Sequence, residues 1–202
     1  MTKIKSGSNL LILIVAALLV LSFLAILVVD RANKSRSQLP IYGQVPPFEF
    51  EDRFENRFGM ENLKGKINVI DFIFTRCKGP CPTMAIYMSD LYQLYSHSDK
   101  VQFVSISVDP AYDTPEILRQ YARQLGVNDN RWRFIRNDSV SRVAELCEGG
   151  FMLAADDLPG GHTTKFILVD HLGRIRSYHD GTDETHIRRL KENIMILAKD
   201  LE

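Results

Sequence analysis

The sequence predicts a layered α/β domain behind an N-terminal transmembrane helix. Three observations support this prediction. Apolar segments typical of strands alternate with helix-like segments from about residue 48 onward. Two β-rich segments near the C-terminus flank a turn motif, which is typical of a hairpin. The run from Leu10 to Val29 contains a single polar side chain, that of Ser22.

Composition excludes several classes of function. The chain has 202 residues, with 25 Lys and Arg side chains balanced by 25 Asp and Glu side chains. A formal net charge of zero argues against a nucleic-acid partner and against a strongly charged partner. Three cysteines are too few for a disulfide scaffold, so they suggest metal or redox chemistry instead.

The N-terminal region divides into three segments. Residues 1–8 form a short basic segment. Residues 9–29 cover roughly 30 Å as a helix, enough to cross a bilayer core. The acidic and basic pair Asp30-Arg31 fits a signal-peptide cleavage site poorly, so the helix is predicted to be an uncleaved anchor. Residues 30–46 are predicted to be a polar tether, and residues 47–202 the globular domain.

Basic residues stand on both sides of the anchor. Lys3 and Lys5 precede it, and Arg31, Lys34 and Arg36 follow it. Because these charges are nearly balanced, the positive-inside rule does not decide the orientation.

The globular segment contains six predicted strands. The segment from Ile67 to Phe74 is almost continuously apolar, as expected of a central strand that is buried on both faces. The turn Asp170-His-Leu-Gly173 joins the last two strands as a hairpin. The predicted strands are residues 48–52, 67–74, 101–108, 132–135, 165–169 and 175–178.

Four helices are predicted between and after these strands. The first follows Pro82. The second begins at Asp113, which we expect to cap it, with Pro115 in the first turn. Ser139 is expected to cap the third helix, and Thr182 or Asp183 begins the last.

Two cysteines stand between the first central strand and the helix that follows it. Cys77 comes just after the strand and close to the helix N-terminus, where the helix dipole favours a thiolate. Cys81 follows one helical turn later, so both sulfur atoms can face the same side. The Cα separation at this spacing is ~6 Å, near the upper end for a disulfide. The pair can therefore close to a Cys77–Cys81 disulfide or open to two thiolates.

The residues leave metal binding and redox exchange open. Three residues separate the cysteines, whereas disulfide exchange favours two. Thiolates are soft ligands that select Cu(I) or Zn, and a third ligand would favour metal binding. His162 is the candidate, because a glycine pair places it in a loop before a strand. The remaining histidines are predicted to be solvated surface residues: His97, His171, His179 and His186.

Other side chains that could bind a metal are predicted to be core or structural residues. Cys147, Met84 and Met88 fall at helical spacing on apolar faces, so we expect them to pack in the core. Asp109 ends a strand near the cysteines. It is predicted to be mainly structural, with a supporting role beside the site as the alternative.

These motifs together resemble the Sco/SenC family of copper-binding proteins involved in cytochrome c oxidase assembly. The resemblance rests on Phe72-Ile-Phe-Thr-Arg-Cys77-Lys-Gly-Pro-Cys81-Pro82, on Val104-Ser-Ile-Ser-Val-Asp-Pro110, and on Gly161-His162-Thr163 before the strand at Phe166. It covers roughly residues 47–200. The three residues between the cysteines are Lys78-Gly79-Pro80. Many members of the family have acidic residues there.

The resemblance implies a thioredoxin-like fold, in which a central mixed sheet is flanked by helices. It implies copper, as Cu(I) and also Cu(II), bound by Cys77, Cys81 and His162. The implied partner is a cytochrome c oxidase subunit at its Cu-A site, or another copper chaperone. The domain is then expected on the extracytoplasmic, periplasmic-type side of the membrane, with the N-terminus inside.

Two alternative activities share the same fold. A thiol–disulfide oxidoreductase that keeps a partner's copper-ligand cysteines reduced would need Cys77 and Cys81 but not His162, and a redox sensor would use the same pair. A thiol peroxidase is disfavoured, because Thr75 stands two residues before Cys77 instead of three.

Overall fold

The computed structural model describes residues 6–34, 39–155, 158–161 and 163–201. The chain divides into two compact units, Met1–Ser37 and Gln38–Glu202. The first unit consists of one helix, and the second contains the whole sheet with its covering helices.

Helix α1 (Ser6–Lys34) forms the first unit. Its window Leu11–Val28 has a mean hydropathy of 3.3, and none of that window is buried within the structure. In the described part of the chain it is the one helix that is long and apolar enough to cross a membrane. The helix continues five residues beyond the end of the predicted anchor at residue 29.

The second unit is built on a mixed sheet of eight strands, in the order β1-β8-β7-β4-β5-β6-β2-β3. The two central strands, β4 and β5, are parallel over seven residue pairs, and β6 continues the parallel set. Strand β7 runs antiparallel to β4 and forms a hairpin with β8. The bounds are β1 Gly43–Gln44, β2 Glu49–Asp52, β3 Arg57–Gly59, β4 Ile67–Ile73, β5 Val101–Ser107, β6 Trp132–Arg136, β7 Lys165–Val169 and β8 Arg174–Asp180.

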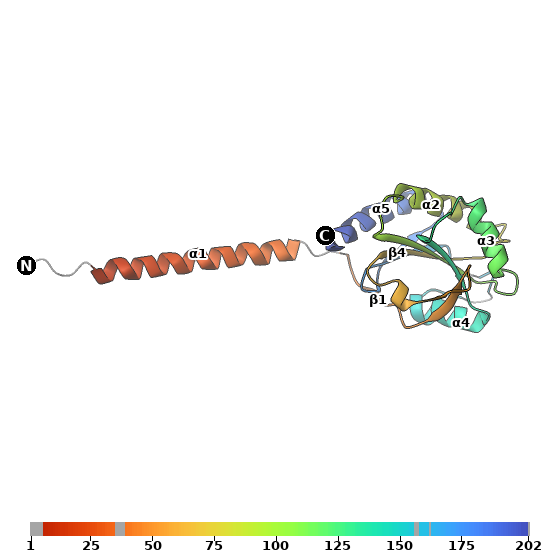
Figure 1. Cartoon of the computed structure of the whole chain (residues 1–202), viewed down its shortest axis with the longest axis horizontal. Coiled ribbons are helices and arrows are strands. Elements are labelled where there is room, and N and C mark those ends of the chain that lie inside the picture. Colours follow the sequence, from red (N-terminus) through yellow and green to blue (C-terminus); the bar gives the residue numbers. More distant parts are fainter. Residues whose placement is uncertain (1–5, 35–38, 156–157, 162, 202) are drawn as a thin grey trace, which may run out of the picture. The chain divides into compact units, whose positions relative to one another are not determined.

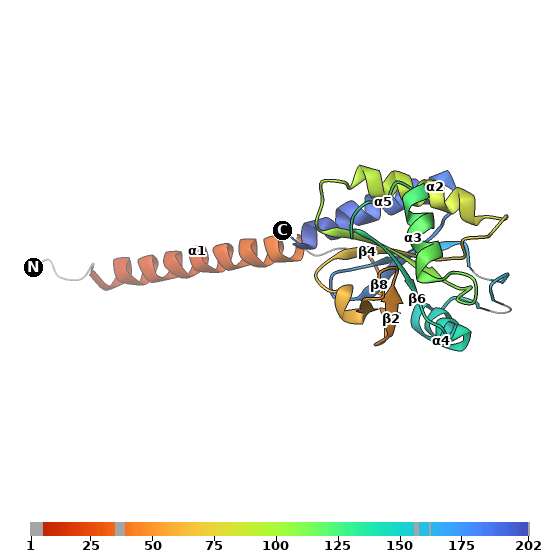
Figure 2. The same cartoon turned by 45° about the vertical axis from the view of Figure 1, so that its right-hand side comes forward.

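Helices cover both faces of this sheet (Figures 1 and 2). α2, α3 and α5 lie on one face, and α4 lies on the opposite face, where Phe50 of β2 and Phe58 of β3 also contribute to the core. The helix bounds are α2 Cys81–Leu94, α3 Pro115–Gln124, α4 Val140–Glu145 and α5 Glu184–Ala198. A π-helical turn, Leu146–Gly150, extends α4, and short 3₁₀ turns occupy Met60–Asn62 and Lys199–Leu201.

The alternation of side chains along β4 creates two hydrophobic cores. Ile67, Val69 and Ile73 face the core beneath α2 and α5, whereas Ile70 and Phe72 face the core beneath α4. All seven residues of β4 are buried. The continuous apolar pattern therefore identified a strand that is covered on both faces.

The six predicted strands and the hairpin near the C-terminus are confirmed. Ser139 and Asp183 cap α4 and α5 as expected, each by accepting a hydrogen bond from a backbone N–H in the first helical turn. Strands β1 and β3 were not predicted, because two or three residues are too few to show a periodic pattern.

The predicted tether is shorter in the structure than residues 30–46. Its last part belongs to the domain, since β1 pairs with β8 and covers that edge of the sheet. Arg176, which is almost fully buried, donates from Nε to the carbonyl of Pro40 at 3.0 Å and from its terminal nitrogen to the carbonyl of Leu39 at 2.5 Å. The same guanidinium binds the buried carboxylate of Asp170 at 2.8 Å.

We expect the substitution Arg176→Met to lower the free energy of unfolding by about 3 kcal/mol. The buried carboxylate of Asp170 would lose its ion pair with Arg176, and the carbonyls of Leu39 and Pro40 would lose their hydrogen bonds. Arg174→Met is the matched control: Arg174 also binds Asp170, but from a position 30% exposed. Its expected cost is about 1 kcal/mol or less. Urea unfolding measures both values, and equal losses would contradict this account.

Candidate metal centre

The two cysteines lie at the carboxyl end of β4. Cys81 is the first residue of α2 and is 2% exposed, whereas Cys77 is half-exposed in the loop before it. Neither cysteine is part of a disulfide, and a hydrogen bond links the two thiols. The structure therefore brings the two predicted sulfur ligands together, with one of them accessible from outside.

A backbone N–H approaches Cys77, but it comes from the loop. The amide of Gly79 lies 3.4 Å from the Cys77 sulfur, and the N–H of Cys77 donates to the carbonyl of Phe74 at 3.2 Å. Helix α2 begins only at Cys81. The prediction placed Cys77 close to the helix N-terminus; in the structure the loop, rather than the helix, supplies its neighbouring N–H.

Burial governs the chemistry of Cys81. It raises the pKa of this thiol to about 12, and the hydrogen bond with Cys77 and the nearby Asp71 act in the same direction. Without a bound metal, Cys81 is therefore a neutral thiol at pH 7. Any metal ion that it ligates must displace this proton.

Asp71 is a site neighbour that the sequence analysis did not assign. It lies within β4, is 1% exposed, and its Oδ1 has no hydrogen-bond partner among the described residues. Burial raises its pKa to about 7, against the opposing effect of a hydrogen bond with Ser105. A single acidic residue inside the apolar run Ile67–Phe74 was the available signal.

The cysteine loop, residues 74–80 between β4 and α2, is held against the loop after β5 by Asp113. This side chain is fully buried and accepts hydrogen bonds from the Thr75 hydroxyl at 2.5 Å and from the Ser107 hydroxyl at 2.6 Å. It also accepts from the backbone N–H of Thr75. Asp113 was predicted to cap the following helix, and that prediction is wrong. The cap is Thr114, whose hydroxyl accepts from the Ile117 N–H at 3.3 Å.

Asp109 makes a second tie to the same loop. Its carboxylate is 2.6 Å from Nε of Arg76, the residue that precedes Cys77. The Arg76 guanidinium also lies 4.7 Å from the ring centroid of Tyr112. Asp109 therefore contacts the neighbour of a sulfur ligand, and its supporting role for the metal remains a prediction.

His162, the predicted third ligand, lies outside the described residues. The strand that follows it enters the sheet beside the cysteines: β7 is antiparallel to β4, with Ile70 paired to Ile167. The first residue of β7, Lys165, is consequently near the end of β4 from which the cysteine loop leaves. Within the described ranges, no group of three or more His, Cys, Asp or Glu side chains could hold a metal ion.

The remaining histidines differ in their burial. His97 is exposed, and His171 and His186 are half-buried. His179 was predicted to be a surface residue, and that is wrong, because it is only 4% exposed. Its Nε2 lies 2.9 Å from the Ser177 hydroxyl and 3.3 Å from the side-chain amide of Asn193. Burial lowers the pKa of His179 to about 4.

The side chains that were assigned to the core are confirmed there. Cys147, Met84 and Met88 are fully buried. Cys147 lies in the π-helical turn after α4, and burial raises its pKa to about 12. Cys147 packs in the core beneath α4, as predicted.

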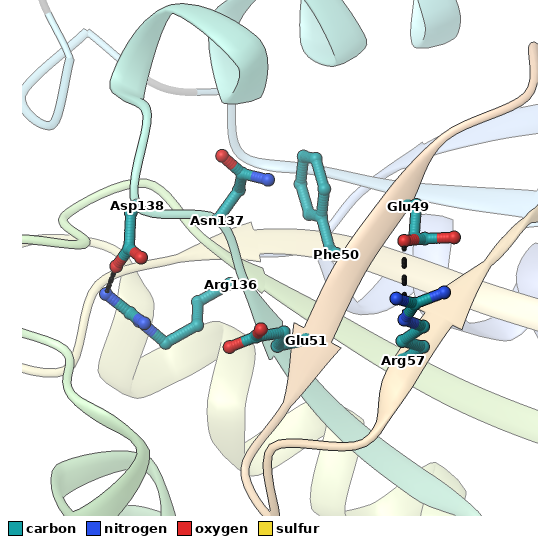
Figure 3. A pocket seen from close by; sticks show the side chains of 7 residues that line it. All are labelled: Glu49, Phe50, Glu51, Arg57, Arg136, Asn137 and Asp138. Carbon is teal, nitrogen blue, oxygen red and sulfur yellow. Dashed lines mark hydrogen bonds and ion pairs between the residues drawn. The ribbon is translucent and has the colours of Figure 1, made fainter.

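A separate polar cleft of about 220 Å³ lies beside β2 and the end of β6 (Figure 3). Its arginines are already paired: Arg136 with Asp138 at 2.5 Å, and Arg57 with Glu49 at 3.6 Å. Each arginine of this cleft therefore already has a carboxylate partner. Its lining residues are Glu49, Phe50, Glu51, Arg57, Arg136, Asn137 and Asp138.

Comparison with known proteins assigns the family. The model of the SCO1/SenC family matches residues 40–195. The chain belongs to the SCO1/SenC family. A solved SCO1/SenC family lipoprotein from Bacillus anthracis is 29% identical, with a TM-score of 0.74 over 81% of this chain and 99% of that protein. This similarity confirms the thioredoxin-like fold.

Two further solved structures of this family are informative. BsSco, described as a cytochrome c oxidase assembly protein with a disulfide switch, is 25% identical, with a TM-score of 0.70 over 81% of this chain and 99% of BsSco. ScoI from Bradyrhizobium japonicum was solved with copper bound; it is 26% identical, with a TM-score of 0.61 over 74% of this chain and 99% of ScoI. These two relatives show a disulfide switch and a bound copper ion on the same fold.

We expect Asp113→Ala to lower the free energy of unfolding by about 2–4 kcal/mol, since Thr75 and Ser107 each lose a buried acceptor. Thr114→Ala removes the helix cap alone and should cost about 1 kcal/mol. Chemical unfolding of the two variants separates these roles. A larger loss of stability for Thr114→Ala than for Asp113→Ala would contradict the role of Asp113 in tying the two loops together.

We expect stability to fall as the pH decreases from about 6.5 to 4, in part because of His179. The unfolded chain takes up a proton near pH 6.5, whereas the folded chain resists it until pH 4, so up to about 3 kcal/mol is lost in this window. His179→Gln should flatten this part of the pH profile of unfolding, and the exposed control His97→Gln should not. Identical profiles for both variants would refute the assignment.

Proposed function

We propose that this protein is a membrane-anchored copper chaperone that serves cytochrome c oxidase assembly. The observation that carries the proposal is the pair of adjacent thiols at the end of β4 in a chain of the SCO1/SenC family. The copper ion is the cargo of this protein, passed on to a partner instead of being retained.

In this proposal, Cu(I) is held by Cys77, Cys81 and His162. Thiolate and imidazole ligands suit Cu(I), and a three-coordinate site leaves room for an incoming ligand. The copper-bound relative supports the choice of metal. The entry of β7 at the cysteine end of β4 supports the choice of His162, since this histidine precedes β7 by three residues.

The contrast between the two cysteines supports a transfer role. Cys77 is half-exposed, so an acceptor can reach its sulfur atom, whereas Cys81 is buried beneath it. Transfer then proceeds by ligand exchange: a partner ligand binds the ion while one of the chain's own ligands leaves. Cu-A subunits of the oxidase and other copper chaperones are the partner classes that this chemistry fits.

Helix α1 is proposed to anchor the protein, with the domain on the extracytoplasmic side. The length and hydropathy of α1 support a membrane span. The similarity to a solved SCO1/SenC family lipoprotein supports a domain that is held at a membrane surface.

A thiol–disulfide reductase is the second candidate function. It is favoured by the hydrogen bond between Cys77 and Cys81, which places the sulfurs close together, and by the disulfide switch described for BsSco. A reductase would cycle the pair between two thiols and a Cys77–Cys81 disulfide, and it would not require His162.

We expect the full chain in lipid nanodiscs, after reduction, to bind one Cu(I) per molecule. Cys77→Ser should abolish stoichiometric binding, and His162→Ala should weaken it by at least roughly 100-fold, because the loss of a mere outer-shell partner already costs roughly 10–100-fold. Competition with a Cu(I) chelator measures both. The exposed residue His97 provides the matched control, His97→Ala, which should bind as the wild type does.

The same variants discriminate between the two functions. If His162→Ala and the wild type bind Cu(I) equally, His162 is not a ligand. If the chain lacks Cu(I) affinity but His162→Ala reduces a test disulfide at the wild-type rate, the reductase is correct and the chaperone is not.

A further inference from the structure

An apolar groove runs from the two sulfurs outward between α2 and α3. Its volume is about 260 Å³, below the ~300–1,000 Å³ of sites for small-molecule ligands. A space of this size suits one or two side chains instead of a cofactor. We call it the α2–α3 groove, and its principal lining residues are Phe74, Cys77, Cys81, Ile86, Tyr121 and Leu125.

The groove begins at the candidate metal centre itself. Cys77 and Cys81 form part of its wall, so a side chain that enters it lies beside the sulfur atoms. All of its described lining comes from the cysteine loop, α2 and α3. In the sheet, β4 lies between β7 and β5.

Ile86 gives the groove an unpartnered apolar wall. It stands on α2 and is 62% exposed, although a side chain of this type is usually buried. Leu94, at the far end of the same helix, is 58% exposed and does not line the groove. The two positions are about 12 Å apart along the helix axis. They therefore separate an effect of the groove from a general effect of exposed apolar surface on α2.

Tyr121 supplies a polar tip inside this apolar space. Burial, together with the neighbouring acidic groups of Asp71, Cys81 and Asp113, holds the pKa of its phenol above the ordinary value. The hydroxyl thus remains protonated and can donate a hydrogen bond to a sulfur atom near the cysteines.

The rim of the groove at the cysteine loop is basic. Lys78 directly follows Cys77, is exposed, and has no ion pair among the described residues. Arg76, on the other side of Cys77, is already bound to Asp109. A free cation beside the exposed sulfur favours a partner segment that carries a carboxylate.

We propose that the α2–α3 groove receives an apolar side chain adjacent to the cysteine of a partner protein, with an acidic residue of the same segment beside Lys78. This inference rests on the proposed function, because it names the partner segment with which Cys77 exchanges. The apolar residue beside the partner's cysteine would contact the groove. A small polar thiol lacks such a residue and would make no contact there.

Thiol–disulfide exchange tests the groove without copper. The probes are two synthetic peptides, acetyl-Glu-Leu-Cys-amide and acetyl-Glu-Ser-Cys-amide, each joined as a disulfide to thionitrobenzoate. The Cys77 thiolate attacks the peptide sulfur, the probe disulfide breaks, and thionitrobenzoate leaves as a coloured thiolate. Cys81 then attacks this mixed disulfide, which releases the peptide thiol and leaves a Cys77–Cys81 disulfide. Two protein thiols are oxidised, and one probe disulfide is reduced to two thiols.

We expect the reduced full chain in nanodiscs to react at least roughly tenfold faster with the leucine probe than with the serine probe, the factor expected for burying a leucine-sized side chain. Ile86→Glu should bring this ratio close to one, and Ile86→Ser should reduce it. The control Leu94→Glu should retain the full ratio. A third probe with lysine in place of glutamate should react more slowly with the wild type, and Lys78→Glu should reverse that preference.

Several results would overturn the proposal. Equal rates of the wild type with the leucine and serine probes would do so, as would equal losses in Ile86→Glu and Leu94→Glu. A concentration-dependent dimer that Ile86→Glu abolishes would show that a second copy of the chain fills the groove. Failure of the wild type to bind Cu(I) would refute the chaperone function, and the probe rates would still decide the groove.

Discussion

The parallel pairing of β4 with β5 is the constraint on which the rest of the domain depends. Seven residue pairs, from Ile67 with Val101 to Ile73 with Ser107, bring both strands to an end at the same edge of the sheet. The cysteine loop leaves β4 there, and the loop that carries Asp109 and Asp113 leaves β5 beside it. Two strands that are consecutive in the sheet thus present reactive and supporting groups together.

Carboxylates then hold the cysteine loop in place. Asp113 binds Thr75, and Asp109 binds Arg76, so both residues that precede Cys77 are tied to the loop after β5. The side chain of Cys77 itself stays half-exposed. A rigid support below an accessible sulfur suits ligand exchange, because the reactive atom is positioned without being enclosed.

The two cysteines differ in their burial. Cys81 and Asp71 lie in the core side of the site, where desolvation raises the pKa of both groups. Cys77 and Lys78 lie at the surface, where a partner can reach them. The apolar groove between α2 and α3 extends this surface away from the sulfurs, and it gives the exchange reaction a direction of approach.

The sequence by itself determined the α/β class, the apolar N-terminal helix, the central strands and the position of both cysteines. These features depend on local patterns: continuous apolar runs, helix caps and residues close together in the chain. Only the tertiary structure showed that Asp113 binds Thr75 instead of capping a helix, and that His179 is buried. It also showed that part of the predicted tether forms β1, the edge strand that pairs with β8. Each of these depends on contacts between residues far apart in sequence, which no local pattern records. The groove beside the cysteines has the same origin, since its walls come from two helices whose approach is set by the sheet beneath them.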